Sequence, residues 1–66
     1  MLKRKDMNEG LIIKVEQLAN GDEFYIVESD QIYECKLLGY RGMNKFEIDR
    51  DGLLTIIDGS ELVIKA

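Results

Sequence analysis

Histidine is absent from this 66-residue sequence, and Cys35 is its single cysteine. One cysteine cannot form an intramolecular disulfide, and without histidine or a second thiol the chain has no ligand set for a structural zinc site. The usual catalytic pairs of serine or cysteine with histidine cannot be built either. Gly39 and Gly42 lack the Lys-Ser/Thr that follows the glycines of a phosphate-binding loop. We therefore expect a protein that is not an enzyme and that carries no cofactor or metal.

The sequence also lacks a long apolar run. A membrane-spanning helix needs about 20 predominantly apolar residues, and no stretch of this chain approaches that length. No apolar stretch follows the basic residues at the N-terminus, as it would in a secretory signal. Because a single cysteine is also typical of a reducing compartment, we expect a cytoplasmic protein.

The charge is distributed unevenly along the chain. It totals −4, from 9 basic and 13 acidic side chains, but three of the basic ones are Lys3, Arg4 and Lys5. An acidic body repels the phosphate backbone on which affinity for nucleic acid mostly depends, so a nucleic-acid partner is disfavoured. We expect residues 1–10 to form a flexible basic arm and residues 11–66 to form one small β-barrel domain.

Apolar and polar residues alternate with a period of two, which is the spacing of β-strands. The predicted strands are residues 11–18, 23–28, 31–38, a short segment through Phe46 and Ile48, residues 53–57 and residues 62–64. Turn signals separate them at Asn20-Gly21, Ser29-Asp30, the loop of residues 39–42, Asp51-Gly52 and Asp58-Gly59. We predict an all-β fold, a small antiparallel meander of five or six strands curled into an SH3-like barrel that hides its edges.

Residues 53–57 depart from this alternation, because four large aliphatic residues surround the single Thr55. One face of such a strand can enter the core, whereas the other needs a second layer or another chain to cover it. We expect a homodimer or a hydrophobic partner surface, and a strongly bent barrel corner that buries both faces is the alternative. The residues expected at an oligomer contact are Leu53, Ile57 and Val63.

Residues 47–58 resemble a calcium-binding loop. They place acids at positions one, three, five and twelve, with Gly52 at position six, as in an EF-hand. Glu47 replaces the usual aspartate at position one, Asp58 is short for bidentate binding at position twelve, and neither flank reads as a helix. Asp51-Gly52 is also typical of a hairpin turn. We expect a structural turn, with calcium binding as the alternative.

Tyr40 and Arg41 lie between two glycines, and tyrosine and arginine are frequent anchors in binding sites. The alternative is a tyrosine that covers the mouth of the barrel. Cys35 lies in mid-strand, where we expect a buried small hydrophobe. The residues predicted to contact a partner are Tyr25, Tyr40, Arg41, Met43, Glu47, Asp49 and Asp51.

Two runs carry a resemblance: Gln17-Leu18-Ala19-Asn20-Gly21-Asp22-Glu23-Phe24 and Gln31-Ile32-Tyr33-Glu34-Cys35. Over roughly residues 11–58 the chain resembles short phage and prophage accessory proteins with an SH3-like small β-barrel. The resemblance implies a viral accessory protein. Some such small acidic proteins inhibit host enzymes or defence systems, by occluding a nucleic-acid channel or by sequestering a signalling nucleotide. The shared pattern is structural, so it assigns no functional residue.

The leading hypothesis is a non-catalytic protein–protein interaction module, a phage-type inhibitor of a host enzyme or defence protein that acts through an acidic and hydrophobic surface. The acids that would imitate a phosphate track are Glu23, Glu28, Glu34, Glu47, Asp49 and Asp51; solubility alone is the alternative role for this charge. A second hypothesis is an oligomer that sequesters an anionic nucleotide through Arg41, Lys45 and Arg50. A third is single-strand binding by stacking on Tyr25, Tyr33 or Tyr40, which the acidic body disfavours.

Overall fold

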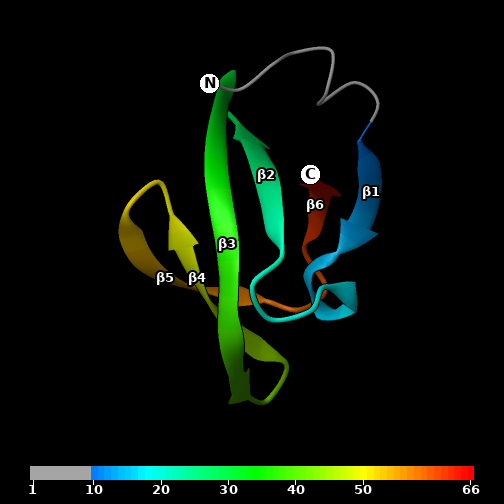
Figure 1. The fold of residues 1–66 in the computed structure, drawn as a ribbon, viewed down its shortest axis with the longest axis vertical. Helices are drawn as coiled ribbons and strands as arrows, with labels where there is room; N and C mark the ends of the chain where they lie inside the picture. Colours follow the sequence, from blue (N-terminus) through cyan, green and yellow to red (C-terminus); the bar gives the residue numbers. More distant parts are fainter. Residues whose placement is uncertain (1–9) are drawn as a thin grey trace.

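The computed structural model describes residues 10–66, so the basic arm predicted over residues 1–10 lies outside the described residues, Gly10 excepted. The described chain forms one sheet of six strands with a single turn of 3₁₀-helix (Figure 1). The elements are β1 (Leu11–Lys14), η1 (Val15–Gln17), β2 (Glu23–Glu28), β3 (Gln31–Gly42), β4 (Lys45–Arg50), β5 (Leu53–Asp58) and β6 (Leu62–Lys65). Every strand pair is antiparallel. The prediction of an all-β antiparallel fold is confirmed.

Strands β2 to β5 follow one another as a meander of three hairpins. Each hairpin turns through two residues with positive φ, which are Ser29-Asp30, Met43-Asn44 and Asp51-Gly52. Two-residue turns of this kind match the twist of the strands that they connect. The predicted turns at Ser29-Asp30 and Asp51-Gly52 are confirmed.

The loop predicted over residues 39–42 is wrong, because β3 continues as a strand to Gly42. The strand accommodates its glycines through two register shifts against β4, between Leu37 and Gly39 and between Tyr40 and Gly42. Such bulges bend a strand without ending it. The chain reverses only after them, at Met43-Asn44.

The strand predicted over residues 11–18 ends early, at Lys14. The next three residues form η1, and the Lys14 N–H donates to the Gln17 side-chain oxygen at 2.8 Å. The Val15 N–H donates to the Glu61 carbonyl at 2.9 Å, which ties η1 to the segment that precedes β6. The turn brings Val15 and Leu18 into the core.

Two of the predicted hairpins are wrong, although their turn residues do reverse the chain. At Asn20-Gly21 the Asp22 N–H donates to the Ala19 carbonyl at 3.0 Å, but the strands on either side, β1 and β2, are not paired. The segment at Asp58-Gly59 does not pair β5 with β6. The strand order is β1-β6-β2-β3-β4-β5, so β6 crosses the molecule and inserts between β1 and β2.

The core lies on one face of the sheet and is small. Its buried residues are Val15, Leu18, Phe24, Cys35, Leu37, Ile48 and Val63. Phe24 faces Cys35 across β2 and β3, and Leu37 faces Ile48 across β3 and β4. The expectation of an oligomer contact at Val63 is wrong, because only 3 % of this residue is exposed and it packs inside the domain. Ile57 packs partly against the core, whereas Leu53 is exposed.

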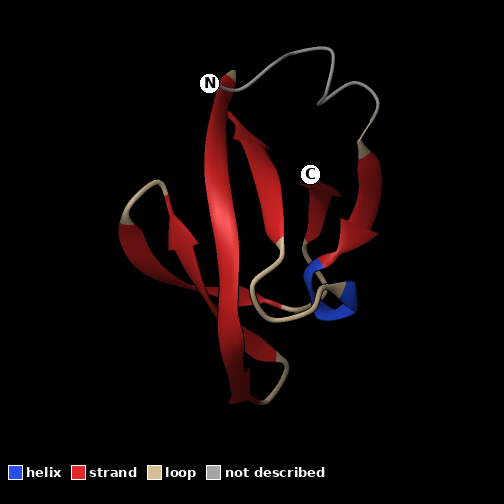
Figure 2. Cartoon of the chain, in the orientation of Figure 1, coloured by secondary structure: helices blue, strands red, loops and turns tan. Residues whose placement is uncertain are grey.

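The sheet is curved but open. A closed barrel requires its two edge strands to pair, and within residues 10–66 β1 pairs only with β6 and β5 only with β4. Figure 2 shows the resulting arrangement, with the β4–β5 hairpin on the left and β1 on the right. The barrel closure that was expected from the sequence is not made by this part of the chain.

Candidate functional site

The outer face of the sheet, opposite the core, carries a row of charged side chains. Successive residues of a strand point to opposite faces, so the neighbours of the core residues in β2, β3 and β4 point outward. Glu23 of β2 faces Lys36 of β3, which in turn faces Asp49 of β4. Beside this row Tyr25 faces Glu34. The middle of the outer face is therefore predominantly acidic.

A groove of about 400 Å³ lies in this region. Its polar lining consists of Glu23, Tyr25, Glu34, Lys36, Asp49 and Asp51, and we call it the acidic groove. Four carboxylates and one ammonium group thus line the groove. The Asp49 carboxylate also accepts a hydrogen bond from the Gly52 N–H at 2.8 Å, which fixes the β4–β5 turn at the end of the groove.

Of the six acids predicted to imitate a phosphate track, the structure brings four together in the acidic groove. Glu28 and Glu47 do not line it. Glu28 points to the core side of the sheet and pairs with Arg50 at 3.4 Å. Glu47 pairs with Arg41 at 3.1 Å. Two acids are therefore engaged by guanidinium groups outside the groove.

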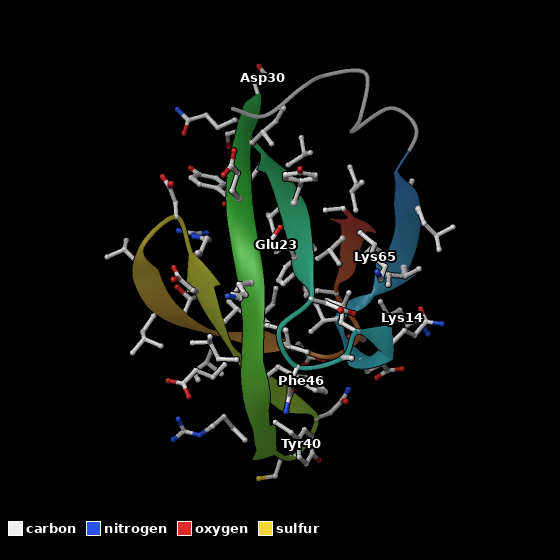
Figure 3. All side chains as sticks on the ribbon, in the orientation of Figure 1. Lys14, Glu23, Asp30, Tyr40, Phe46 and Lys65 are labelled. Carbon is white, nitrogen blue, oxygen red and sulfur yellow. The ribbon has the colours of Figure 1, made fainter. Side chains whose placement is uncertain are left out.

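A second group of predicted contact residues lies at the far end of β3. Figure 3 shows Tyr40 and Phe46 there, at the opposite end of the molecule from Asp30. The two rings pack edge to face with centroids 5.1 Å apart, and the Tyr40 hydroxyl accepts the Asn44 N–H at 3.2 Å. Met43 in the turn is 92 % exposed.

The predicted partner residues therefore form two groups rather than one. Tyr25 lies opposite Glu34, and Tyr40 follows Glu34 by six residue steps along the extended strand β3. At about 3.3 Å per residue this places the two tyrosines roughly 20 Å apart along the sheet. Tyr25, Asp49 and Asp51 belong to the acidic groove, whereas Tyr40, Arg41, Met43 and Glu47 belong to the end of the β3–β4 hairpin.

The cations expected to hold an anionic ligand are all engaged in ion pairs within the domain. Each pairs with a carboxylate: Arg41 with Glu47 at 3.1 Å, Lys45 with Asp58 at 3.0 Å and Arg50 with Glu28 at 3.4 Å. Hydrogen bonds from the Ser60 N–H, the Lys45 ammonium and the Ser60 hydroxyl lower the pKa of Asp58 to about 2. The Asp58 carboxylate that pairs with Lys45 is therefore ionised at neutral pH.

The sequence interpretation missed a contact on the core side of the sheet. The Arg50 guanidinium lies 4.7 Å from the centre of the Tyr33 ring, a cation–π contact. Beside Arg50 is a second groove of about 310 Å³ with an aliphatic floor that includes Ile48 and Ile57. Arg50 lies two residues after Ile48, so the alternation of β4 alone would have placed it on this face.

The three tyrosines proposed for base stacking do not share a surface. Tyr25 points outward, Tyr33 is in contact with Arg50 on the core side, and Tyr40 lies at the end of β3. A stacking platform needs aromatic faces side by side along one path. The arrangement gives no such path.

Residues 47–58 form the β4–β5 hairpin, not a loop between helices. The expected structural turn at Asp51-Gly52 is confirmed, and the EF-hand interpretation is wrong because strands flank the turn. Within residues 10–66 no three acidic or thiol side chains lie close enough to hold a metal ion. Cys35 is buried, as expected, and burial raises the pKa of its thiol to about 11. The thiol is therefore protonated and inert at neutral pH.

The acidic groove lies between two apolar strips. Within residues 10–66 the exposed large hydrophobic residues are Leu11, Ile12, Val27, Leu38, Tyr40, Met43, Leu53, Leu54, Ile56 and Leu62. On one side of the groove the outer face carries Ile12, Ile64 and Tyr25, which are neighbours because Ile64 faces Ile12 in β1 and Tyr25 in β2. On the other side Leu54 faces Asp49 across β4 and β5. Across the outer face, the acidic groove is therefore flanked on each side by an apolar strip.

Comparison of the chain with protein-family models, with curated proteins and with solved structures finds no match. The helical content of residues 10–66 is η1 alone, which is far too short to cross a bilayer. The strand order and the pattern of the outer face are therefore the features from which a function is inferred.

Proposed function

We propose that this protein is a non-catalytic interaction module that binds another protein through the outer face of its sheet. The observation that carries the proposal is the acidic groove between two apolar strips. Monomeric proteins rarely expose large contiguous apolar patches, and such a patch beside polar residues is typical of a protein-binding surface. Among residues 10–66 the exposed hydrophobic residues of the outer face include Ile12, Leu54 and Ile56, so that apolar side chains lie on both sides of the groove.

The two kinds of surface have different roles in this proposal. The apolar strips supply most of the affinity, because buried hydrophobic anchors dominate protein interfaces. The acidic groove accelerates the encounter with a basic partner and disfavours acidic ones. Four carboxylates against Lys36 leave the groove negative, so a partner with a basic strip flanked by apolar residues fits it.

A basic strip of this kind is what proteins that handle nucleic acid present to phosphate groups. We therefore extend the proposal to a partner of that class, whose nucleic-acid site the groove carboxylates would occupy. The resemblance to phage accessory proteins supports a host enzyme or defence protein as the target. The single, buried cysteine supports a cytoplasmic location.

The SH3-like class also remains part of the proposal. Strands β2 to β5 form the meander, and β6 returns to lie beside β2, the first strand of that meander. This order supports an SH3-like arrangement of strands in which the edge strands β5 and β1 are not paired with each other. The hypothesis of an oligomer that sequesters an anionic nucleotide is disfavoured, because each of its three candidate cations is paired with a carboxylate of the domain.

The proposal is tested by capture from bacterial lysate with three baits. The first is the wild-type protein. The second is Glu23→Gln/Glu34→Gln, which removes two charges from the acidic groove. The third is Glu16→Gln/Asp30→Asn, which removes two charges from exposed positions outside the groove. Proteins and released small molecules are identified by mass spectrometry.

We expect a stoichiometric basic partner with the wild-type and the control bait, and a loss of at least roughly tenfold with the groove variant. The encounter rate with the wild type should also fall steeply with salt. Equal capture by all three baits would contradict a role for the groove. Recovery of an anionic nucleotide with no protein would replace the proposal with the sequestering hypothesis.

A further inference from the structure

Strand β5 is an edge of the sheet, and its residues 53–57 lack the usual protection of a charge, a proline or a bulge. It pairs with β4 over all six of its residues without a register shift, and within residues 10–66 no strand pairs with its other side. Proteins normally protect such an edge with a charge, a proline, a bulge or a covering segment. Residues 53–57 contain no charge and no proline, and Leu54 and Ile56 are 69 % and 52 % exposed.

The phase of hydrogen bonding in β5 follows from its hairpin. Arg50 and Leu53 flank the two-residue turn, and residues in that position exchange both backbone hydrogen bonds. The same alternation reaches the Gly59 N–H, which donates to the Asn44 carbonyl at 2.7 Å. Leu54 and Ile56 therefore direct their N–H and C=O groups away from β4, toward the free side.

We propose that β5 pairs antiparallel with β5 of a second copy, about a twofold axis at Thr55, so that two sheets become one continuous sheet. In this register Leu54 faces Ile56 of the partner subunit, and all the outward backbone groups of both residues find partners. Thr55 faces its own copy, and Leu53 faces Ile57 of the partner subunit. Aliphatic and Thr–Thr cross-strand pairs of this kind stabilise sheets.

The neighbouring symmetric registers fit less well. An axis at Ile56 would set Leu54 opposite a charged Asp58, whose carbonyl already accepts the Glu61 N–H at 3.1 Å. An axis at Leu54 would set Ile57 opposite Asp51. Only the axis at Thr55 sets residues 53–57, the uncharged part of β5, opposite residues 53–57 of the second copy.

A second copy is the occupant that this edge fits, because a twofold interface must be complementary to itself. The chain has a net charge of −4, and two copies approach with least repulsion along an uncharged segment. The other edge, β1, has only four residues and ends in Lys14. A single pair of strands covers less than the 800 Å² or so per partner of a standard interface, so we expect a dimer with a dissociation constant in the micromolar range or weaker.

This inference goes beyond the proposed function, because the edge of β5 can pair whether or not the acidic groove binds a partner. It is tested first by sedimentation equilibrium from about 1 μM to about 1 mM, the range in which weak interfaces form. We expect the wild type to pass from monomer to dimer and Ile56→Lys to remain a monomer. The matched control is Val27→Lys on β2, since Val27 is also 52 % exposed; this variant should dimerise like the wild type.

The register is tested by disulfide cross-linking. Residues at the axis form a pair without hydrogen bonds, with Cα atoms about 4.5 Å apart, which suits a disulfide. Thr55→Cys should therefore cross-link to itself roughly tenfold faster than Leu54→Cys, which faces Ile56 of the partner subunit. Cys35 is buried and does not compete. A monomer at every concentration, a dimer that survives Ile56→Lys, or equal cross-linking of the two cysteine variants would each overturn the proposal.

Discussion

Gly59, directly after β5, is the position where one added methyl group should cost most. The residue is buried, its N–H donates to the Asn44 carbonyl at 2.7 Å, and its carbonyl accepts the Glu16 N–H at 2.9 Å. A Cβ atom at this position would lie 2.8 Å from the Phe46 ring and would collide with the Asn44 side chain. Both backbone groups are fixed by hydrogen bonds, so the segment cannot move aside without losing them.

The expected cost follows from two opposing effects. Overpacking destabilises the folded state by about 1–3 kcal/mol. Alanine also has less conformational freedom than glycine in the unfolded chain, which stabilises the folded state by about 0.4–1 kcal/mol. We therefore expect Gly59→Ala to lower the free energy of unfolding by about 1–2 kcal/mol. With a denaturant slope of about 1 kcal/mol per molar urea, the midpoint of unfolding should fall by about 1–2 M.

The measurement is urea unfolding followed by far-UV circular dichroism. Gly39→Ala is the matched control, because a Cβ at Gly39 would meet nothing within 4 Å, and its midpoint should stay within about 0.5 M of the wild type. Asn44→Gly/Gly59→Ala should recover part of the loss, since it removes one obstacle and leaves Phe46. A Gly59→Ala midpoint equal to that of the wild type would refute the packing described after β5.

Three further predictions concern titration and the core. The pKa of Asp58 is about 2 in the folded protein against 3.8 for a free side chain, so Asp58 contributes stability above about pH 4 that is lost as the pH falls toward 2. In a plot of the urea midpoint against pH, Asp58→Asn should reduce the fall between about pH 4 and pH 2. An unchanged fall would contradict this role of Asp58. For Cys35 the folded pKa of about 11 exceeds the free value of 9.0, so stability should fall as the pH rises from 9 toward 11. Cys35→Ala should remove that slope, and a slope that persisted would have another origin. Ile48→Ala, at a fully buried position, should cost about 2–5 kcal/mol in urea unfolding, whereas the exposed Ile12→Ala should change stability by less than about 0.5 kcal/mol.

The local features of this fold could be predicted because they depend on neighbouring residues. Short apolar or alternating runs bounded by turn signals gave the strands β2, β4 and β5 nearly at their observed bounds. Ser29-Asp30 and Asp51-Gly52 adopt the positive φ that two-residue hairpins need, and Asp and Gly tolerate that conformation. At these sites the chemistry of two or three residues decides the backbone.

The insertion of β6 between β1 and β2 could not be predicted in the same way. It depends on pairing between residues far apart in the sequence, such as Ile12 with Ile64. The local pattern of apolar and polar residues does not indicate which strands are neighbours in the sheet. Asn20-Gly21 and Asp58-Gly59 turn the chain as expected, yet neither connects paired strands. A turn signal thus predicts a reversal of the chain, but not the partner of the strand that follows.

The candidate site was predicted in part, and the errors have a common cause. Glu34 and Asp49 were expected among the acids that imitate a phosphate track, and both line the acidic groove. Tyr40 and Arg41 were expected at the same partner surface because the sequence predicted a loop over residues 39–42. With β3 continuous to Gly42, the length of the strand carries these two side chains away from the groove.

The acidic groove and the edge of β5 can be occupied at the same time, so separate variants can test partner binding and dimerisation. Pairing at β5 about a twofold axis keeps the outer faces of both copies on the same side of the joined sheet, because residues opposite each other across a pair of strands point to the same face. The strip formed by Leu54 and Ile56 would then lie between two acidic grooves. Glu23→Gln/Glu34→Gln should weaken the capture of a partner and leave the sedimentation of the protein alone unchanged.

Ile56→Lys should abolish the dimer. It should also weaken a partner that spans both grooves, because linked sites bind more tightly than either site alone. A partner that binds the Ile56→Lys monomer as tightly as the wild type would show that one groove suffices and that dimerisation serves another purpose. Loss of partner binding in Ile56→Lys together with full binding by Glu23→Gln/Glu34→Gln would move the binding surface from the acidic groove to the apolar strip of β5.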